Sequence, residues 1–240
     1  MTVNQPLSGF LLVDKPTGPT SFQIVAHVRS LWGGKKSRLR VGHAGTLDPR
    51  ASGLLIIAVG QATRLLSSIV GLDKTYEVTI TLGATTTTDD AEAEPTPWLV
   101  TTPPTREFVE HVLQQFVGDQ QQVPPNYSAK KQAGIRLYKL ARQGKKITST
   151  AHPVAIYSIR LQRYNYPTLE LTVHCSSGTY IRSLARDIGT ALKTGGYVQS
   201  LRRTTIGPFR VSEAVALAEF STKQNLVVAP DKFLSRIQPR

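Results

Sequence analysis

A run of six apolar residues, Leu54 to Val59, places the strongest constraint on the fold of this chain. The run is flanked by glycines and is far too short to span a bilayer, so it predicts a strand buried in a sheet. KTYEVTITLG at 74–83 alternates strictly between apolar and polar residues, which is typical of a half-buried strand, and Tyr76 lies on its apolar face. Further strands are predicted at GFLLVDKP (9–16), PVAIYSIRL (153–161), TLELTVHC (168–175) and from Tyr197 to Ile206.

Helical patterns are interspersed with these strands in no regular order. They predict helices from Thr20 or Ser21 to Gly33, over 62–71, from Thr105 to Gly118, from Ser177 or Gly178 to Leu192, and near Ser212 to Phe220. In the fourth helix Arg182 lies in the first turn, off the apolar stripe. TTTTDDAEAEPTPW at 85–98 has no period and is predicted to be a loop. The irregular order favours an α+β fold over a doubly wound parallel sheet.

The net charge of +13, with an isoelectric point near 10.1, indicates a polyanionic partner. Residues 120–169 contain no carboxylate but nine basic side chains: Lys130, Lys131, Arg136, Lys139, Arg142, Lys145, Lys146, Arg160 and Arg163. A second basic group comprises Arg29, Lys35, Lys36, Arg38, Arg40 and Arg50. The alternative interpretation is a solvated basic face. An anionic membrane is disfavoured, because neither group forms a continuous amphipathic helix.

The remaining composition predicts a cytoplasmic protein with no metal and no cofactor. The N-terminus lacks the pattern of a signal peptide, and the chain has one cysteine and five scattered histidines without metal-ligand spacing. Motifs for nucleotide hydrolysis, dinucleotide binding, zinc proteolysis and the hydrolase nucleophile elbow are missing from the sequence.

Chemistry is indicated by GHAGTLDPRASGLL at 42–55, where Asp48 follows two glycines and precedes Pro49. Glycines allow close backbone approach and proline fixes the chain just beyond the aspartate, so this loop would hold a carboxylate exposed but immobile. Two interpretations follow from these residues alone: Asp48 is a turn residue, or it is a reagent.

The longer stretch VGHAGTLDPRASGLLIIAVGQATRL resembles the catalytic motif of the TruB family of tRNA pseudouridine synthases. Five other segments match that family in the same order, and together the matches cover nearly all of the chain up to about Phe220. They are LLVDKPTGPTS (11–21), KTYEVTITLG (74–83), VPPNYSAKKQAGIRLYKLARQG (123–144), CSSGTYIRSLARDIG (175–189) and LRRTTIGPF (201–209). The resemblance implies a pseudouridine synthase fold with a mixed, mostly antiparallel sheet.

The resemblance also implies a role for each candidate residue. Asp48 would be the nucleophile, attacking either ribose C1′ or uracil C6 of uridine 55 in the T loop. Arg182 would pair with Asp48, and Tyr76 would stack on the flipped base and could take the C5 proton. His43 would fill the space that the uridine leaves. Base-pocket positions match Tyr180 and Leu201, and Lys15 and Pro16 match a segment that supports the catalytic loop.

The organisation expected is a catalytic domain over 1–220, with a basic RNA-clamping insertion at about 120–152, followed by a short extension over 221–240 without a full PUA domain. In the insertion, Lys130, Lys131, Arg142 and Lys145 are expected to bind tRNA. We expect a monomer whose partner is the T arm of tRNA. Two rival functions stay open at this point: a catalytically idle RNA-binding protein or tRNA-folding chaperone, and a pseudouridine synthase acting on another RNA.

Overall fold

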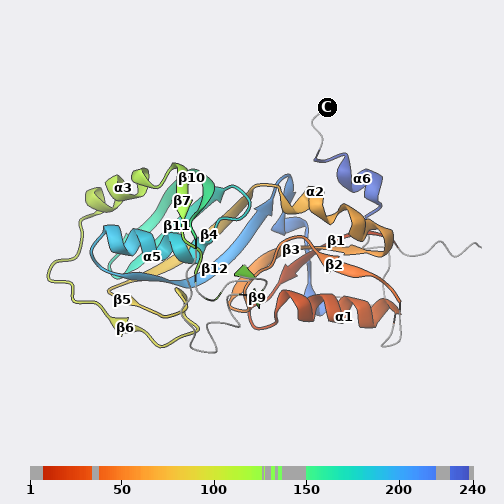
Figure 1. Ribbon diagram of the computed structural model, residues 1–240, viewed down its shortest axis with the longest axis horizontal. Coiled ribbons are helices and arrows are strands. Elements are labelled where there is room, and N and C mark those ends of the chain that lie inside the picture. Colours follow the sequence, from red (N-terminus) through yellow and green to blue (C-terminus); the bar gives the residue numbers. More distant parts are fainter. Residues whose placement is uncertain are drawn as a thin grey trace, which may run out of the picture. The chain divides into compact units, whose positions relative to one another are not determined.

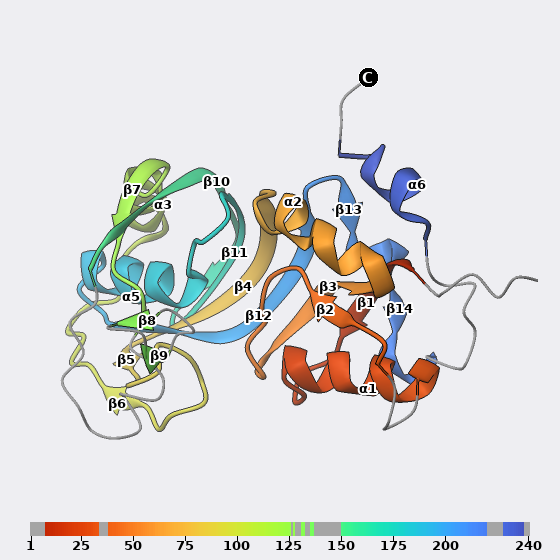
Figure 2. The ribbon, with the colours of Figure 1, turned by 45° about the vertical axis from the view of Figure 1, so that its right-hand side comes forward.

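The computed structural model describes residues 8–33, 38–125, 127, 131–132, 135–136, 150–219 and 228–237. Its contacts divide the chain into two compact units (Figures 1 and 2). Unit 1 comprises residues 1–75 and 202–240, and unit 2 comprises residues 76–201. Among the described residues, no helix is both long enough and apolar enough to cross a membrane.

Unit 1 is built on the strands β14, β1, β3 and β12 in that order, with β2 beside β3 and β13 beside β12. The strand bounds are β1 Gly9–Lys15, β2 Val41–His43, β3 Ala51–Val59, β12 Gly196–Ile206, β13 Phe209–Arg210 and β14 Val215–Ala216. The division between the units falls within β12. β1 is antiparallel to β3 and parallel to β14, so the sheet is mixed.

The predicted apolar run lies in β3, whose side chains point alternately to two hydrophobic clusters. One cluster contains Leu55 and Ile57 and is covered by α1, Ser21–Gly33. The other contains Leu54 and Ile56 and is covered by the 3-10 helix η1, Gly60–Leu65, and by α2, Leu66–Val70. Figure 2 shows α1 and α2 on opposite sides of β1 and β3. Burial on both faces explains why this strand carries no polar alternation.

Residues 228–237 pack within unit 1. The short helix α6, Pro230–Leu234, inserts Phe233 between two aromatic rings, with centroid distances of 4.2 Å to Phe10 and 4.0 Å to Phe209. The two-part organisation predicted for this end of the chain, with a boundary at residue 220, stays a prediction.

Unit 2 contains the strand order β12, β4, β11, β10, β7, and β10 is antiparallel to both β11 and β7. The strand bounds are β4 Lys74–Leu82, β7 Gly118–Gln122, β10 His152–Asn165 and β11 Thr168–Cys175. Two pairs of two-residue strands lie outside this sheet: β5 Ala84–Thr85 with β6 Thr96–Pro97, and β8 Lys131–Gln132 with β9 Ile135–Arg136. Among its described residues, the helices are α3, Arg106–Gln115, and α5, Ile181–Ala191. Ile181, Leu184 and Ile188 of α5 are buried, and Figure 1 shows this helix lying along the strands of the unit. The predicted α+β class is confirmed.

Several element boundaries differ from the predictions. The helix expected from Ser177 or Gly178 begins only at Ile181, because Gly178 takes a positive φ of 89° in a turn. The helix expected over 62–71 is a 3-10 turn followed by five α-helical residues. The helix expected near Ser212 is absent from the described residues 211–219, which form the 3-10 turns η2, Val211–Glu213, and η3, Leu217–Glu219, on either side of β14. Pairing of β14 with β1 overrides the helical pattern there.

Candidate active site

The loop that carries Asp48 joins β2 to β3 in unit 1 and is anchored on both sides of the aspartate. The hydroxyl Oγ of Ser21 donates to the Leu47 carbonyl and accepts from the Leu47 amide, both at 2.9 Å. On the other side, the Pro49 carbonyl accepts from the Gly18 amide at 2.8 Å and from Lys15 Nζ at 3.4 Å. Asp48 itself is half-buried. The segment between β1 and α1 therefore fixes the backbone beside a carboxylate that solvent can still reach.

Arg203 on β12 holds the same loop from within the core. Its side chain is almost fully buried, and it donates from Nε to the Leu54 carbonyl at 2.8 Å and from Nη2 to the Gly45 carbonyl at 3.1 Å. Two glycines are required here for steric reasons. Gly45 has a φ of 91°, and Gly53 has a φ of 101° and lies so close to Arg203 that an added Cβ would overlap the Arg203 carbonyl. Arg203 lies in the matched segment LRRTTIGPF (201–209), but the sequence analysis gave it no role.

Two further side chains of unit 1 lie in the electrostatic field of this loop. Burial lowers the pKa of Lys15 from 10.5 to about 8, although the Asp48 charge opposes the shift and the Arg203 charge adds to it. Burial and then the Arg203 charge also lower the pKa of His43. The lowered pKa favours the neutral ring of His43, which suits contact with an uncharged base better than contact with a phosphate.

In unit 2, Tyr76 is buried on the apolar face of β4 together with Val78 and Ile80. Its position in the strand is the one predicted from the alternation. Arg182, predicted to lie off the apolar stripe of its helix, is also buried, with 6% of the residue exposed.

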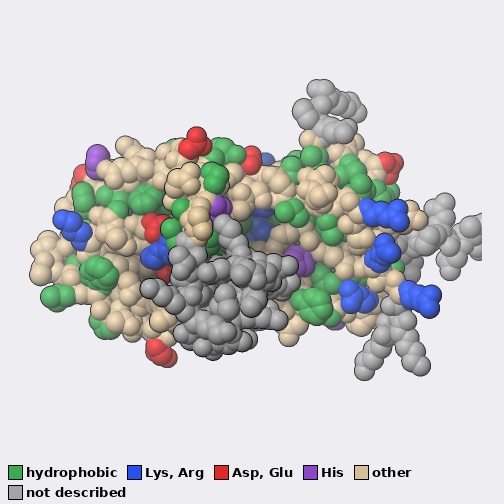
Figure 3. Space-filling view, in the orientation of Figure 1, with side chains coloured by type: hydrophobic (Ala, Val, Ile, Leu, Met, Phe, Trp, Pro, Cys, Tyr) green, Lys and Arg blue, Asp and Glu red, His purple; other side chains and the backbone are tan. Residues whose placement is uncertain are grey.

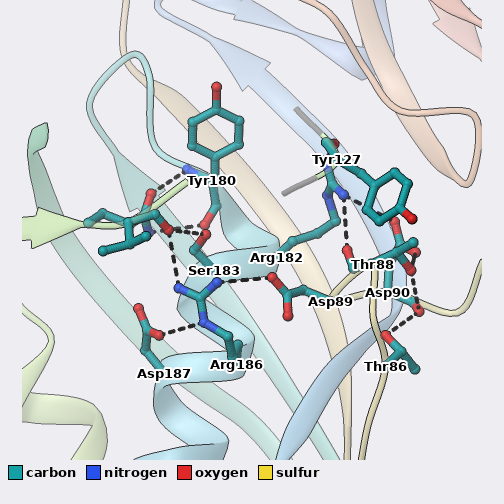
Figure 4. Close-up of polar contacts among 12 residues, drawn as sticks. Thr86, Thr88, Asp89, Asp90, Tyr127, Tyr180, Arg182, Ser183, Arg186 and Asp187 are labelled. Atoms are coloured by element: carbon teal, nitrogen blue, oxygen red, sulfur yellow. Dashed lines mark hydrogen bonds and ion pairs between the residues drawn. The ribbon is translucent and has the colours of Figure 1, made fainter. Parts of the chain in front are cut away.

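The burial of Arg182 is balanced by acceptors from two neighbouring segments (Figure 4). Nη1 donates to the Thr88 carbonyl at 3.0 Å and lies 3.7 Å from Asp90 Oδ2, and Nη2 donates to the Tyr127 carbonyl at 2.8 Å. Asp90 is buried, and its Oδ1 accepts from Thr88 Oγ1 at 2.6 Å and from the Glu92 amide at 3.0 Å. Sequence reasoning missed Asp90, because it lies in the segment 85–98, where no periodicity distinguishes it from the exposed carboxylates Glu92 and Glu94.

The other predicted site residues have less defined surroundings. Tyr180 is half-buried directly before α5, and Leu201 is half-buried in β12. Lys131 lies in β8, paired with Arg136 of β9. The remaining three predicted tRNA contacts, Lys130, Arg142 and Lys145, lie outside the described residues. Because Asp48 and Arg182 belong to different units, their predicted pairing stays a prediction.

Figure 3 shows Lys and Arg side chains gathered over unit 1, around α1 and η1. Of the second basic group, Arg38, Arg40 and Arg50 are exposed in unit 1, and Arg64 of η1 is also exposed. Lys35 and Lys36 lie outside the described residues. Of the first basic group, Arg160 and Arg163 are also exposed, on β10 of unit 2.

Solved structures share this fold. The chain matches a protein in the crystal structure of an archaeal box H/ACA sRNP Nop10–Cbf5 complex with a TM-score of 0.64 and 25% identity, over 89% of this chain and 52% of that one. It also matches a chain of a Cbf5–Nop10–Gar1 complex with a TM-score of 0.72 and 24% identity, over 95% of this chain and 62% of that one. The chain thus spans about half to three-fifths of these solved chains.

Family models cover most of the sequence. The model described as TruB family pseudouridylate synthase, N-terminal domain, matches residues 33–181, and the model described as tRNA pseudouridylate synthase B C-terminal domain matches residues 182–237. Proteins named tRNA pseudouridine synthase B are 45% identical in Paenarthrobacter aurescens, over 90% of this chain and 70% of that protein, and 39% identical in Corynebacterium efficiens, over 99% and 80%. The chain belongs to the TruB family of pseudouridylate synthases, which confirms the family predicted from the motifs.

Proposed function

We propose that the chain is an isomerase that converts uridine 55 in the T loop of tRNA to pseudouridine, with Asp48 as the nucleophile. The names of its relatives support tRNA as the substrate. The observation that carries the proposal is the anchoring of the Asp48 loop, where Ser21 holds the residue before the aspartate and Gly18 and Lys15 hold the residue after it. A half-exposed carboxylate on a fixed backbone suits a nucleophile that must meet an extruded base in one geometry.

In the proposed reaction, the Asp48 carboxylate attacks ribose C1′ or uracil C6 and forms a covalent adduct while the bond between N1 and C1′ breaks. The freed uracil rotates, C5 bonds to C1′, and the adduct releases Asp48 unchanged. C5 loses a proton and N1 gains one, so the reaction is an isomerisation that consumes no co-reactant. A carboxylate is suited to this because it is ionised at neutral pH and can leave again.

The other residues have supporting roles in this proposal. Tyr76 stacks on the base and takes the C5 proton, and Arg182 stabilises the Asp48 charge. The neutral His43 ring occupies the place that the uridine vacates in the loop. Tyr180 and Leu201 line the base pocket. The basic insertion, through Lys130, Lys131, Arg142 and Lys145, holds the T arm of a tRNA in the cytoplasm, and the protein acts as a monomer.

The test is tritium release from C5-labelled uridine in a tRNA transcript, compared with a transcript in which position 55 is cytidine. We expect release from the first alone, and a loss of at least about a thousandfold in Asp48→Asn with tRNA binding retained. Asp119→Asn, the same change on exposed β7, is the control. Turnover near the wild-type rate in Asp48→Asn would falsify the role of Asp48 as the nucleophile. A wild type that binds tRNA without releasing tritium indicates an idle RNA-binding protein or chaperone, and release only from another RNA indicates a different substrate.

A further inference from the structure

The side-chain amide of Gln122 is almost fully buried and makes both of its hydrogen bonds to the backbone of one residue. Gln122 ends β7 and is 4% exposed. Its Nε2 donates to the Tyr180 carbonyl at 3.0 Å, and its Oε1 accepts from the Tyr180 amide at 2.8 Å. This reciprocal pair resembles the two bonds that opposite residues exchange in an antiparallel ladder. It fixes both the position and the orientation of the Tyr180 peptide groups.

Tyr180 is the N-cap residue of α5, and its side chain makes no capping hydrogen bond there. Its carbonyl also accepts the first helical bond, from the Leu184 amide at 3.1 Å. The direction in which the helix begins is therefore set at Tyr180 through the amide of Gln122. Figure 4 shows the Tyr180 ring directed away from the Arg182 and Arg186 ion pairs. The ring makes a T-shaped contact with the His152 ring at a centroid distance of 5.8 Å.

The residue after Gln122 strengthens the same attachment. The Val123 carbonyl accepts from Ser183 Oγ at 2.8 Å and from Arg186 Nη2 at 3.1 Å, so the segment that leaves β7 is tied to the first turns of α5. The bonds to Val123 hold the helix in place, whereas the bonds of Gln122 are made to Tyr180 itself. A buried amide is costly unless both of its groups are bonded, so its presence here reflects a geometric requirement at Tyr180.

We propose that Gln122 is a positioning residue for pseudouridine formation, which orients Tyr180 so that its ring forms one wall of the pocket for the flipped base. The proposal rests on the proposed function, since it needs a base in that pocket. Gln122 does not touch the substrate. It acts through Tyr180, and its loss displaces the ring without removing any phosphate interaction.

The experiment measures single-turnover pseudouridine formation at saturating enzyme, the dissociation constant for tRNA and the melting temperature. We expect Gln122→Met to lower the single-turnover rate about tenfold to a hundredfold, because a small displacement of a positioning group is costly, while the dissociation constant changes less than about threefold. Gln162→Met, the same substitution at an exposed position of β10, removes an amide that donates to Thr172 Oγ1 at the surface and should leave the rate unchanged. Should Gln122→Met fail to fold, Gln122→Asn retains the amide but shortens its reach by one methylene group.

A double-mutant cycle separates positioning from general destabilisation. In a Tyr180→Leu background, Gln122→Met should change the rate less than about twofold, because the ring it positions is gone, while its effect on the melting temperature persists. Equal effects on the rate in both backgrounds overturn the proposal, as does a wild-type rate in Gln122→Met. A wild-type protein that forms no pseudouridine in tRNA overturns the proposed function itself, whereas the other two outcomes concern Gln122 alone.

Discussion

The Ser21 hydroxyl binds both polar groups of the Leu47 backbone, because it donates to the Leu47 carbonyl and accepts from the Leu47 amide. The two residues are 26 positions apart, and both are buried. Ser21, the first residue of α1, thereby fixes the backbone position of Leu47, which directly precedes Asp48. The anchoring depends on a hydroxyl, because neither an apolar side chain nor a carboxylate can both donate and accept at that point.

The first prediction concerns this hydroxyl. Ser21→Ala removes both hydrogen bonds and leaves a buried amide and carbonyl unpaired, so we expect a loss of about 1–3 kcal/mol in the free energy of unfolding and a lower kcat. Urea unfolding and tritium release measure the two effects. Ser30→Ala in the same helix removes only an exposed bond to the His27 carbonyl and serves as the control. An unchanged kcat in Ser21→Ala at full saturation with tRNA would show that the Asp48 loop does not need this anchor.

A second prediction distinguishes the roles of Arg182 and Arg186, the two arginines of α5. Arg182→Met leaves Asp90 buried without its ion-pair partner, which should cost about 3–5 kcal/mol in stability, and it should lower kcat strongly with little change in tRNA affinity. Asp90→Asn should lower kcat in the same direction but less, since Thr88 and the Glu92 amide still hold the side chain.

The control for the Arg182 and Asp90 variants is Arg186, which lies one turn after Arg182 in α5. Arg186 pairs with Asp89 at 3.0 Å and is more exposed, so Arg186→Met should affect kcat far less than Arg182→Met. Steady-state kinetics with a fixed tRNA transcript measure all three variants. A rise in KM with kcat intact in Arg182→Met would identify this residue as a phosphate contact instead.

Lys15 provides a prediction on pH. Its folded pKa of about 8 lies below its ordinary value of 10.5, so between these values the unfolded chain binds more protons than the folded one. The stability contribution of neutral Lys15 is therefore full above about pH 10.5 and is lost as the pH falls to about 8. In Lys15→Met this dependence is gone. The difference in free energy of unfolding between wild type and variant should change across that window and stay constant below it.

Urea unfolding at a series of pH values measures the difference, and Lys232→Met on exposed α6 is the matched control. Equal pH profiles for wild type and Lys15→Met would show that Lys15 keeps its ordinary pKa in the folded protein.

Sequence patterns located six of the strands, namely β1, β3, β4, β10, β11 and β12, because buried residues recur in them in an apolar run or at alternate positions. They failed where contacts distant in the chain decide the structure. Val215 lies in a helical pattern, but it pairs with Val13 in a parallel bridge. Phe233 lies in a short segment with no detectable period, yet it completes an aromatic stack with Phe10 and Phe209.

The same limit applies to the candidate site. The motif residues themselves, Asp48 above all, are identified by residue type and spacing. Their supports are visible only in three dimensions, because Arg203 reaches Gly45 across 158 positions and Arg182 reaches Thr88 across 94. A buried arginine and an exposed one have the same letter in a sequence, and only the acceptors around each side chain distinguish them.

The last prediction tests RNA binding away from the catalytic loop. If residues 120–152 clamp the T arm, replacing Lys130, Lys131, Arg142 and Lys145 with glutamine should weaken tRNA binding and flatten its salt dependence. Removing one phosphate-binding side chain should reduce the slope of log K against log salt by about 0.7 to 0.9, because fewer counterions are released. The single-turnover rate at saturating enzyme should change far less, since these side chains do not touch the base.

The comparison set is Arg38, Arg40 and Arg50, which are exposed in unit 1. Filter binding at several salt concentrations gives the slope for each set of glutamine variants. A flatter slope for the comparison set together with an unchanged slope for the insertion set would place the RNA on unit 1 and make the acid-free insertion a solvated face. Reduced slopes in both sets would mean that the tRNA contacts both basic groups at once, because every released counterion marks a phosphate held by the protein.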